Sequence, residues 1–150
     1  MTKQYRRNVL AVIVNKDRKI LVGERSDRPG IWQMPQGGID EGETSEEALM
    51  RELKEEIGTD KARIIKKLDD KIAYDFPEEL AGDIMKKYKG QIQDWFLLEL
   101  EDTAVLDLSK SLGEFTALDW KDADSILSGI VFWKKEAYKQ GLEAFNLLRG

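Results

Sequence analysis

Neither cysteine nor histidine occurs in this chain of 150 residues. Without cysteine, the protein has no disulfides, no thiolate zinc sites and no cysteine nucleophile. Without histidine, it lacks the commonest general base and the commonest transition-metal ligand. Acid–base or metal chemistry therefore falls to carboxylates, lysine, tyrosine or water, and carboxylate oxygens favour hard cations such as magnesium, manganese or calcium.

Long apolar runs are also missing. No stretch approaches the roughly 20 apolar residues that a membrane-spanning helix needs, and residues 1–5 lack the apolar centre of a secretion signal. We therefore expect a cytoplasmic protein with no membrane partner. The net charge of −5 argues against sequence-blind binding to duplex DNA, but it leaves room for a local basic pocket that receives one nucleotide end.

The order of apolar and amphipathic segments predicts the fold. Strands rich in Val and Ile, or alternating in polarity, are expected at 8–15, 19–24, 62–68, 71–75, 91–100 and 114–120, the first two being candidates for a hairpin. Helices are expected from a cap at Thr44 or Ser45 to Gly58, at 78–88 and at 132–148, with a helical turn at 125–127. Strands interleaved with two substantial helices, without repeats or linkers, predict one α/β domain over residues 1–150 with a mixed sheet.

The first long helix carries an unusual group of acidic residues. Glu52, Glu55 and Glu56 are three and four positions apart, so they share one helix face. Like charges on one face repel, and Arg51 offsets only part of that repulsion. Two interpretations fit: a solvated glutamate-rich surface, or a site where a divalent cation gathers the carboxylates.

The segment around this helix favours the second interpretation. From Gly37 it reads GGIDEGETSEEALMRELKEEIGT, which resembles the Nudix box. The matching positions are Gly37, Glu43, Arg51, Glu52, Leu53, Glu55, Glu56 and Gly58. Thr59 departs from the pattern, because a bulky aliphatic residue is usual there.

This resemblance implies a Nudix fold, an α/β/α sandwich with a mixed sheet, and a metal-dependent pyrophosphohydrolase. It implies that Glu52, Glu55 and Glu56 hold Mg²⁺, with Mn²⁺ as the alternative ion, and that Gly37 lies at the metal. Arg51 and Glu43 would brace the loop–helix junction. Gly37 and Gly38 would let the backbone approach the phosphates closely.

Glu114 is a further candidate for the chemistry. It precedes Phe115, with Trp120 following, which resembles an acidic position in bacterial RNA pyrophosphohydrolases. The resemblance makes Glu114 a fourth metal ligand or the general base, and Glu52 is the other candidate base. The alternative is an ordinary exposed loop glutamate.

Five further segments resemble one branch of the family, the RNA pyrophosphohydrolases and the plant-type diadenosine tetraphosphate hydrolases. They are YRRNV at 5–9, WQMPQGG at 32–38, YDFP at 74–77, KGQIQDWF at 89–96 and VFWKKEAY at 131–138. Together they cover most of the chain in matching order.

The same segments suggest residues that bind substrate. Cationic and polar side chains would reach the phosphates. Arg25 could instead stack on a base. Aromatic and apolar side chains would form a wall against a base, with packing in the core as the alternative for each aromatic. The predicted substrate-binding residues are Arg6, Arg25, Tyr74, Gln93, Val131, Trp133 and Lys134, besides the two glycines.

We expect hydrolysis of 5′-triphosphorylated RNA to 5′-monophosphorylated RNA, with release of pyrophosphate or of successive orthophosphates. A dinucleoside polyphosphate such as diadenosine tetraphosphate is the alternative substrate. An inactive nucleotide-binding module is disfavoured, because no carboxylate of the box is lost. The sequence leaves open whether the protein is a monomer or a homodimer.

Overall fold

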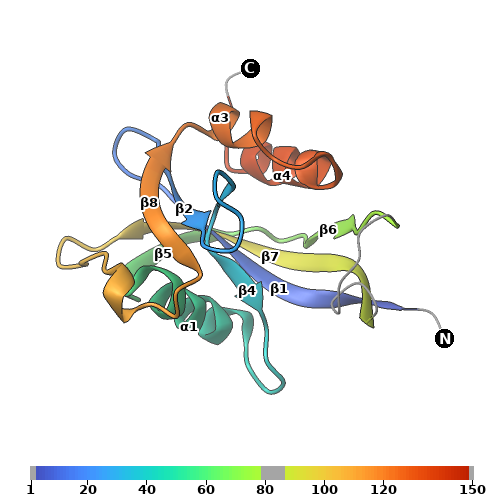
Figure 1. Cartoon of the computed structure of the whole chain (residues 1–150), viewed down its shortest axis with the longest axis horizontal. Coiled ribbons are helices and arrows are strands. Elements are labelled where there is room, and N and C mark those ends of the chain that lie inside the picture. The colour runs from blue at the N-terminus through green and yellow to red at the C-terminus, as the bar shows by residue number, and fades with distance from the viewer. Residues whose placement is uncertain (1–2, 79–86, 149–150) are drawn as a thin grey trace.

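The computed structural model describes residues 3–78 and 87–148, and it places helices on both faces of a large mixed sheet (Figure 1). The large sheet has the order β4-β1-β7-β5, and β6 also pairs with β7. Only β1 and β7 pair in parallel among these neighbours. The strands are β1 (Gln4–Ile13), β4 (Gln36–Gly38), β5 (Ala62–Lys67), β6 (Ile72–Asp75) and β7 (Tyr88–Leu100).

A second, antiparallel sheet has the order β3-β2-β8. It consists of β2 (Ile20–Arg25), β3 (Trp32–Gln33) and β8 (Phe115–Lys121). The helices are α1 (Ser45–Ile57), the short 3₁₀ helix η1 (Leu108–Lys110), α3 (Ala123–Ser128) and α4 (Phe132–Ala144). No helix in the described ranges is both long and apolar enough to span a bilayer.

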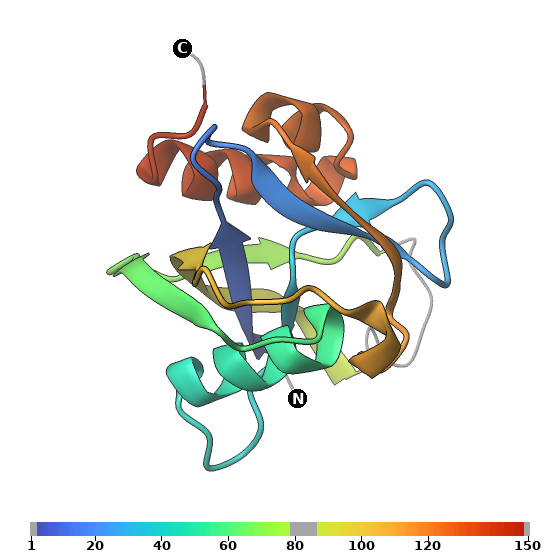
Figure 2. The same cartoon turned by 90° about the vertical axis from the view of Figure 1, so that its left-hand side faces the viewer.

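The buried strand β1 explains the two-sided core. Val9, Ala11 and Ile13 pack in the cluster that contains α1, whereas Leu10 and Val12 pack in the cluster that contains α4. Successive side chains of a strand point to opposite faces, so an uninterrupted apolar run is what a strand covered on both sides requires. Both views show α1 and α4 on opposite sides of the large sheet (Figures 1 and 2). The predicted α/β sandwich is confirmed.

Helix α1 begins and ends where local chemistry predicts. The Thr44 hydroxyl accepts a hydrogen bond from the Glu47 amide at 3.1 Å, and the Glu47 carboxylate accepts one from the Thr44 amide at 3.0 Å. This capping box satisfies two amides that the helix cannot pair, and such a cap contributes about 1 kcal/mol. Gly58 ends the helix in the left-handed conformation, with φ of 81°.

The suggested hairpin of the first two strands is wrong. Strands β1 and β2 meet only in an isolated bridge between Val14 and Ile20 and then enter different sheets. Strand β4 pairs with β1 at Asn8–Leu10, and β7 takes the other edge of β1. With both edges of β1 occupied, β2 has no edge on which to pair.

Two other predicted helices differ from the sequence prediction. The C-terminal helix ends at Ala144 rather than at residue 148, because Asn146 adopts a positive φ of 58° that turns the chain out of the helix. The short helix expected at 78–88 falls mostly on residues 79–86, which lie outside the described residues, and Tyr88 already belongs to β7.

Gly141 lets α4 approach the large sheet closely. A Cβ at this position would overlap the ring of Trp95, which is fully buried. We expect Gly141→Ala to lower the free energy of unfolding by about 1–3 kcal/mol, measured by urea denaturation, because an overpacked core must shift its rings or backbone. Gly129→Ala is the control, since its nearest contact is the Ser125 carbonyl oxygen at 3.6 Å. Equal stability of the two variants would contradict this account.

Candidate active site

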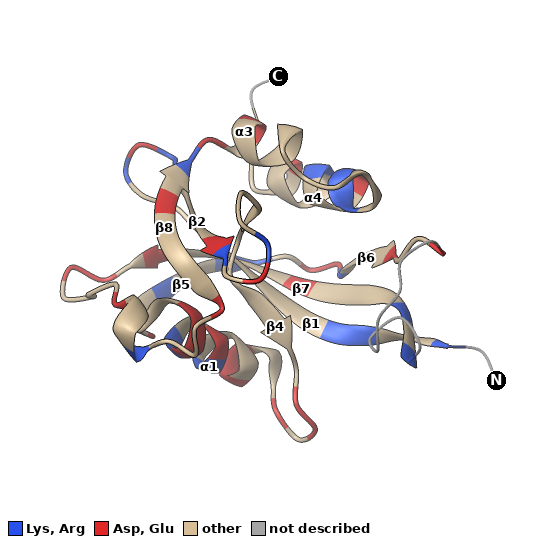
Figure 3. Ribbon diagram, viewed as in Figure 1, with Lys and Arg blue, Asp and Glu red and all other residues tan. Residues whose placement is uncertain are grey.

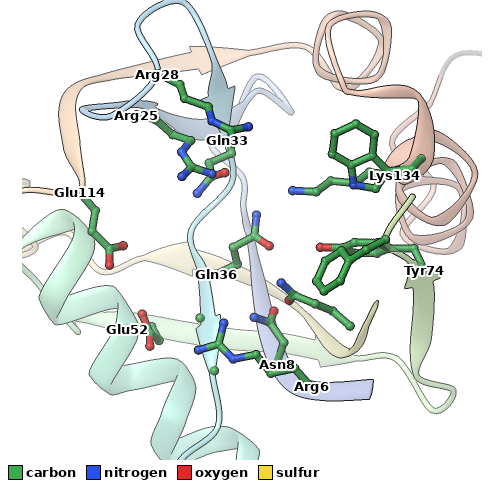
Figure 4. Close-up of a pocket in the computed structure, with 15 residues that line it drawn as sticks. Arg6, Asn8, Arg25, Arg28, Gln33, Gln36, Glu52, Tyr74, Glu114 and Lys134 are labelled. Atoms are coloured by element: carbon green, nitrogen blue, oxygen red, sulfur yellow. The ribbon is translucent and has the colours of Figure 1, made fainter. Parts of the chain in front are cut away.

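A cleft of about 360 Å³ lies over β4, between the carboxylates of α1 and the first turn of α4. Figure 4 shows Glu52 and Glu114 on one side of this cleft and Tyr74 and Lys134 on the other. Strand β4 forms the floor, and Arg25 at the end of β2 and Arg28 in the loop after it contribute to the wall. Charged groups of opposite sign therefore line one cavity.

Glu52 faces β4 at close range. Gly37 has no side chain, and a Cβ there would overlap the Glu52 carboxyl group. Burial raises the pKa of Glu52 to about 7, although hydrogen bonding and attraction by Arg51 oppose the shift. The negative charges of Glu55 and Glu114 add to the rise. This carboxyl group can therefore exchange a proton near neutral pH.

Glu56 lies deeper, with 1% of its surface exposed. Its Oε2 atom accepts a hydrogen bond from the Gln36 amide at 3.1 Å, while Oε1 has no hydrogen-bond partner among the described residues. Burial raises the pKa of Glu56 well above its ordinary value, and the nearby carboxyl groups of Glu114 and Glu52 raise it further. An unpartnered carboxylate oxygen inside a protein is costly, so this atom is a strong candidate for a cation ligand.

Arg51 joins α1 to the loop that precedes it. Its guanidinium donates two hydrogen bonds to Glu43, at 2.7 and 2.9 Å, and one to the Gly38 carbonyl at 2.8 Å. It also donates to Glu52 at 2.9 Å and to Glu55 at 3.3 Å. Hydrogen bonds from Arg51 lower the pKa of Glu43 to about 2. The bracing that the Nudix resemblance implied is thus present as direct contacts.

The donors at this end of the cleft fit a hard divalent cation. The described residues contain no preformed group of three acidic side chains that could hold a metal, and Arg51 instead holds Glu52 and Glu55. Yet the unpartnered Oε1 of Glu56 and the space that Gly37 leaves beside Glu52 give a cation oxygen ligands and room. All of these donors are oxygens, which suit magnesium or manganese.

Four cationic side chains also line the cleft, namely Arg6, Arg25, Arg28 and Lys134. Lys134 lies across the cleft from Glu52 and Glu114, whereas Arg25 lies near Glu114 and Arg6 near Glu52 (Figure 4). Arg25 is held by two hydrogen bonds to Asp27, at 2.8 and 2.6 Å. Burial, together with repulsion by Arg25 and Arg28, lowers the pKa of Lys134 to about 8. Cations that repel one another within a cleft form a strong site for an anion such as a polyphosphate.

Aromatic side chains close the side of the cleft that Lys134 lines. The Lys134 ammonium lies 5.7 Å from the centre of the Tyr74 ring, and Tyr74 contacts Phe76 edge to face. The Tyr74 hydroxyl is buried without a hydrogen-bond partner in the described part of the chain, and it points into the cleft (Figure 4). Trp133 lines the same wall. Rings of this kind provide surfaces for a nucleobase.

Some predicted site residues do not line the cleft directly. Glu56 is buried against the Gln36 amide, and Glu55 contacts Arg51 along α1. Val131 precedes the first turn of α4 and is half-buried. These residues therefore lie behind or beside the surface that a substrate would meet.

Gln93 is the clear correction, because its side chain is fully buried. It donates to the side-chain oxygen Oδ1 of Asn8 at 3.0 Å and to the side-chain oxygen of Gln36 at 3.3 Å, and it accepts from the Trp95 indole at 3.0 Å. It therefore cannot reach the phosphate chain.

Sequence reasoning missed several polar residues of the cleft. Nothing in the sequence distinguishes Arg28 from the other polar residues of its loop, and Gln36 belongs to a matching segment without a role of its own. Gln36 forms the floor and donates a hydrogen bond to the Tyr138 hydroxyl at 3.0 Å. Asn8 and Gln91 also line the cavity. Both are polar residues of strands, but so is the fully buried Gln93, so polarity alone does not mark the cleft.

Comparison with known proteins agrees with this geometry. A family model described as the NUDIX domain matches residues 4–140. An RNA pyrophosphohydrolase of a Nitratiruptor species is 42% identical over 148 residues, which span 96% of this chain and 95% of that protein. The chloroplastic Nudix hydrolase 26 of Arabidopsis thaliana is 40% identical over 149 residues, covering 94% of this chain and 69% of that protein.

Solved structures give the same fold. The E. coli dihydroneopterin triphosphate pyrophosphohydrolase matches with a TM-score of 0.67 and 26% identity, covering 95% of this chain and 99% of that one. A C. elegans Ap4A hydrolase complex matches with a TM-score of 0.64 and 18% identity, over 93% and 97% of the two chains, and shares the fold alone. By sequence, by fold and by the arrangement of its box, this chain belongs to the NUDIX family.

Proposed function

We propose that this protein hydrolyses the polyphosphate at the 5′ end of RNA, converting a 5′-triphosphate to a 5′-monophosphate with release of pyrophosphate. One observation carries the proposal: the carboxylates of Glu52 and Glu114 line the same cleft as four cationic side chains and three aromatic rings. The name of the Nitratiruptor relative supports RNA as the substrate. Such a substrate goes with a cytoplasmic enzyme, and we propose that residues 1–150 act as one catalytic domain.

The acidic side would perform the metal chemistry. NUDIX hydrolases generally use divalent metal ions, and we propose Mg²⁺, with Mn²⁺ as a substitute. Glu52 and Glu56 would hold the ion beside Gly37, and Glu55 would join them if Arg51 yields its contact. Glu114 would be either a further ligand or the general base. When bound, the ion supplies positive charge against the phosphate oxygens and lowers the pKa of the attacking water.

The chain's own residues divide the remaining work. Arg51 is a positioning residue that fixes α1 against the Gly38 carbonyl. Arg6, Arg25 and Lys134 would bind the phosphates, while Tyr74 and Trp133 would face the base. Glu52 and Glu114 are the two groups that could take the proton from water. A loss of kcat in Glu114→Gln, with metal affinity unchanged, would assign that role to Glu114.

The direct test compares substrates in the presence of magnesium. Triphosphorylated RNA should give monophosphorylated RNA and pyrophosphate or orthophosphate. A phosphate assay measures the released phosphate, and gel mobility of the RNA measures the conversion of its 5′ end. Nucleoside triphosphate and diadenosine tetraphosphate are the comparison substrates. No conversion of RNA ends would defeat the proposed substrate.

A dinucleoside polyphosphate is the second candidate, because it presents the same phosphate chain between two nucleosides. The cavity next to the cleft supports it, since both are lined by Arg25, Gln33 and Glu114. A second nucleoside could sit in that cavity. Faster turnover of diadenosine tetraphosphate than of triphosphorylated RNA would favour this substrate.

Lys134 predicts how activity depends on pH. Its pKa is lowered to about 8, so the side chain is charged below pH 8 and neutral above it. We expect kcat/KM to fall on the order of tenfold as pH rises past 8, because a charged hydrogen bond to phosphate is lost. Lys134→Arg should remove this decline, since arginine stays charged. Lys135→Arg, an exposed neighbour, is the control, and an unchanged decline in Lys134→Arg would refute the assignment.

A further inference from the structure

Helix α4 is fastened to the floor of the cleft by a hydrogen bond between two side chains. The side-chain amide of Gln36 donates to the hydroxyl of Tyr138 at 3.0 Å. Within residues 3–78 and 87–148, this is the side-chain hydrogen bond that joins α4 to β4. The backbone amide of the same glutamine holds Glu56 at 3.1 Å. One residue of the floor therefore contacts both the acidic side of the cleft and the helix that carries Lys134.

A chain of buried polar groups sets the direction of this hydrogen bond. The Trp95 indole can only donate, so Gln93 accepts with its side-chain oxygen at 3.0 Å. Gln93 then donates with its NH₂ group to the side-chain oxygen of Gln36 at 3.3 Å. Gln36 is left to present its own NH₂ group to Tyr138. Because Trp95, Gln93 and Tyr138 are all fully buried, the core itself fixes the order of donors and acceptors.

Packing of α4 does not require the Tyr138 hydroxyl. The ring contacts Trp95 edge to face, with 5.4 Å between centroids and 89° between planes, and a phenylalanine ring would make the same contact. Gln36 lines the cleft, where water can serve its amide in place of the hydroxyl. What the hydrogen bond adds is a fixed position of α4 over the floor.

That position determines where Lys134 stands. Lys134 and Tyr138 are four positions apart on α4, so they share one face of the helix and are separated by about one turn. Figure 3 shows basic residues on α4, whereas acidic residues gather on α1. Lys134 meets Glu52 and Glu114 only across the width of the cleft (Figure 4). A shift of α4 on its anchor would therefore move the ammonium group relative to both carboxylates.

We propose that Tyr138 is a positioning residue for phosphate binding: through Gln36, its hydroxyl holds α4 where Lys134 meets the phosphate chain of the substrate. The inference rests on the proposed function, in which Lys134 binds phosphate. Hydrogen bonds weaken steeply when their geometry is disturbed, so a small movement of the helix weakens the Lys134 contact. Glu56 keeps its place, because the backbone amide of Gln36 holds it whatever the side chain does.

Tyr138→Phe tests the proposal, since it removes the hydroxyl and keeps the ring. We expect KM for triphosphorylated RNA to rise about tenfold, while kcat stays within about twofold, because Lys134 would bind the phosphates equally before and during hydrolysis. In a Gln36→Met background, which lacks the side-chain amide but keeps the backbone amide, Tyr138→Phe should have no further effect. Tyr88→Phe is the control, because Tyr88 does not line the cleft, and it should leave both constants unchanged.

A Lys134→Met background decides whether Tyr138 acts through Lys134. There Tyr138→Phe should change KM by less than about twofold, and an equal rise in both backgrounds would overturn the proposal. A fall in kcat at constant KM, together with a lower melting temperature, would show that Tyr138 only stabilises the core. The same cycle, measured as affinity for diadenosine tetraphosphate by calorimetry without magnesium, does not depend on turnover. If wild type converts no RNA, the proposed function fails while this cycle still tests Tyr138.

Discussion

Glu56→Gln should lose hydrolysis by a factor of about 10²–10⁴ while the folded protein becomes more stable without metal. Gln has the size of Glu, so the contact with the Gln36 amide can persist. The substitution replaces the unpartnered carboxylate oxygen Oε1 by part of a neutral amide, which has no negative charge to offer a cation. Turnover with magnesium measures the loss, and magnesium should no longer raise the melting temperature as it does in wild type.

The gain in stability follows from the raised pKa of Glu56. Its pKa in the folded state is above the ordinary value near 4.5, so the folded protein binds more protons than the unfolded chain above that pH. Stability therefore falls as pH rises from about 4.5 toward the folded pKa, and Glu56→Gln removes that loss. Urea denaturation in EDTA at pH 5 and pH 8 measures it. A variant that is both inactive and less stable at pH 8 would indicate damage to the fold.

Gly37→Ala should lower kcat by about 10²-fold with little effect on stability. The added methyl group would overlap the Glu52 carboxyl, which is the flexible end of a long side chain and can move aside. The fold therefore survives, but a catalytic carboxylate is displaced, and a displacement of about 1 Å can cost that factor. Single-turnover assays and thermal unfolding separate the two effects.

Gly38→Ala is the matched comparison for this strand. Its methyl group would meet the Arg6 guanidinium rather than a carboxylate. We expect a rise in KM with a smaller change in kcat, because Arg6 would bind phosphate without joining the metal chemistry. If both alanine variants lost kcat equally, the assignment of Gly37 to the metal side and of Gly38 to phosphate binding would be wrong.

Local signals made α1 predictable. Thr44 and Gly58 act within one helical turn of the ends that they fix, and the helical period alone places Glu52 and Glu56 on one face. The structure shows that both are buried, which a sequence pattern cannot reveal for charged residues. The family resemblance added Glu114, whose distance in sequence from α1 hides its position at the same cleft.

Non-local features escaped prediction. The choice of β4 rather than β2 as the partner of β1 depends on which edge is free after folding. Gln93 lies on a strand that is buried on both faces, so neither its polarity nor its alternation tells whether it meets the cleft or the core. Arg28 reaches the cleft from a loop without periodic pattern.

The two walls of the cleft belong to two separate hydrophobic clusters on opposite faces of the same sheet. Substitutions in the cluster behind α4 should therefore change which nucleoside is accepted, and substitutions in the cluster behind α1 should change turnover. When one substitution from each cluster is combined, their effects on the free energy of unfolding should add to within about 0.5 kcal/mol. A chain built in this way can acquire a new substrate through mutations on one face while inherited hydrolysis persists on the other. Substrate preference can therefore change by mutation while the fold and the hydrolytic residues stay the same.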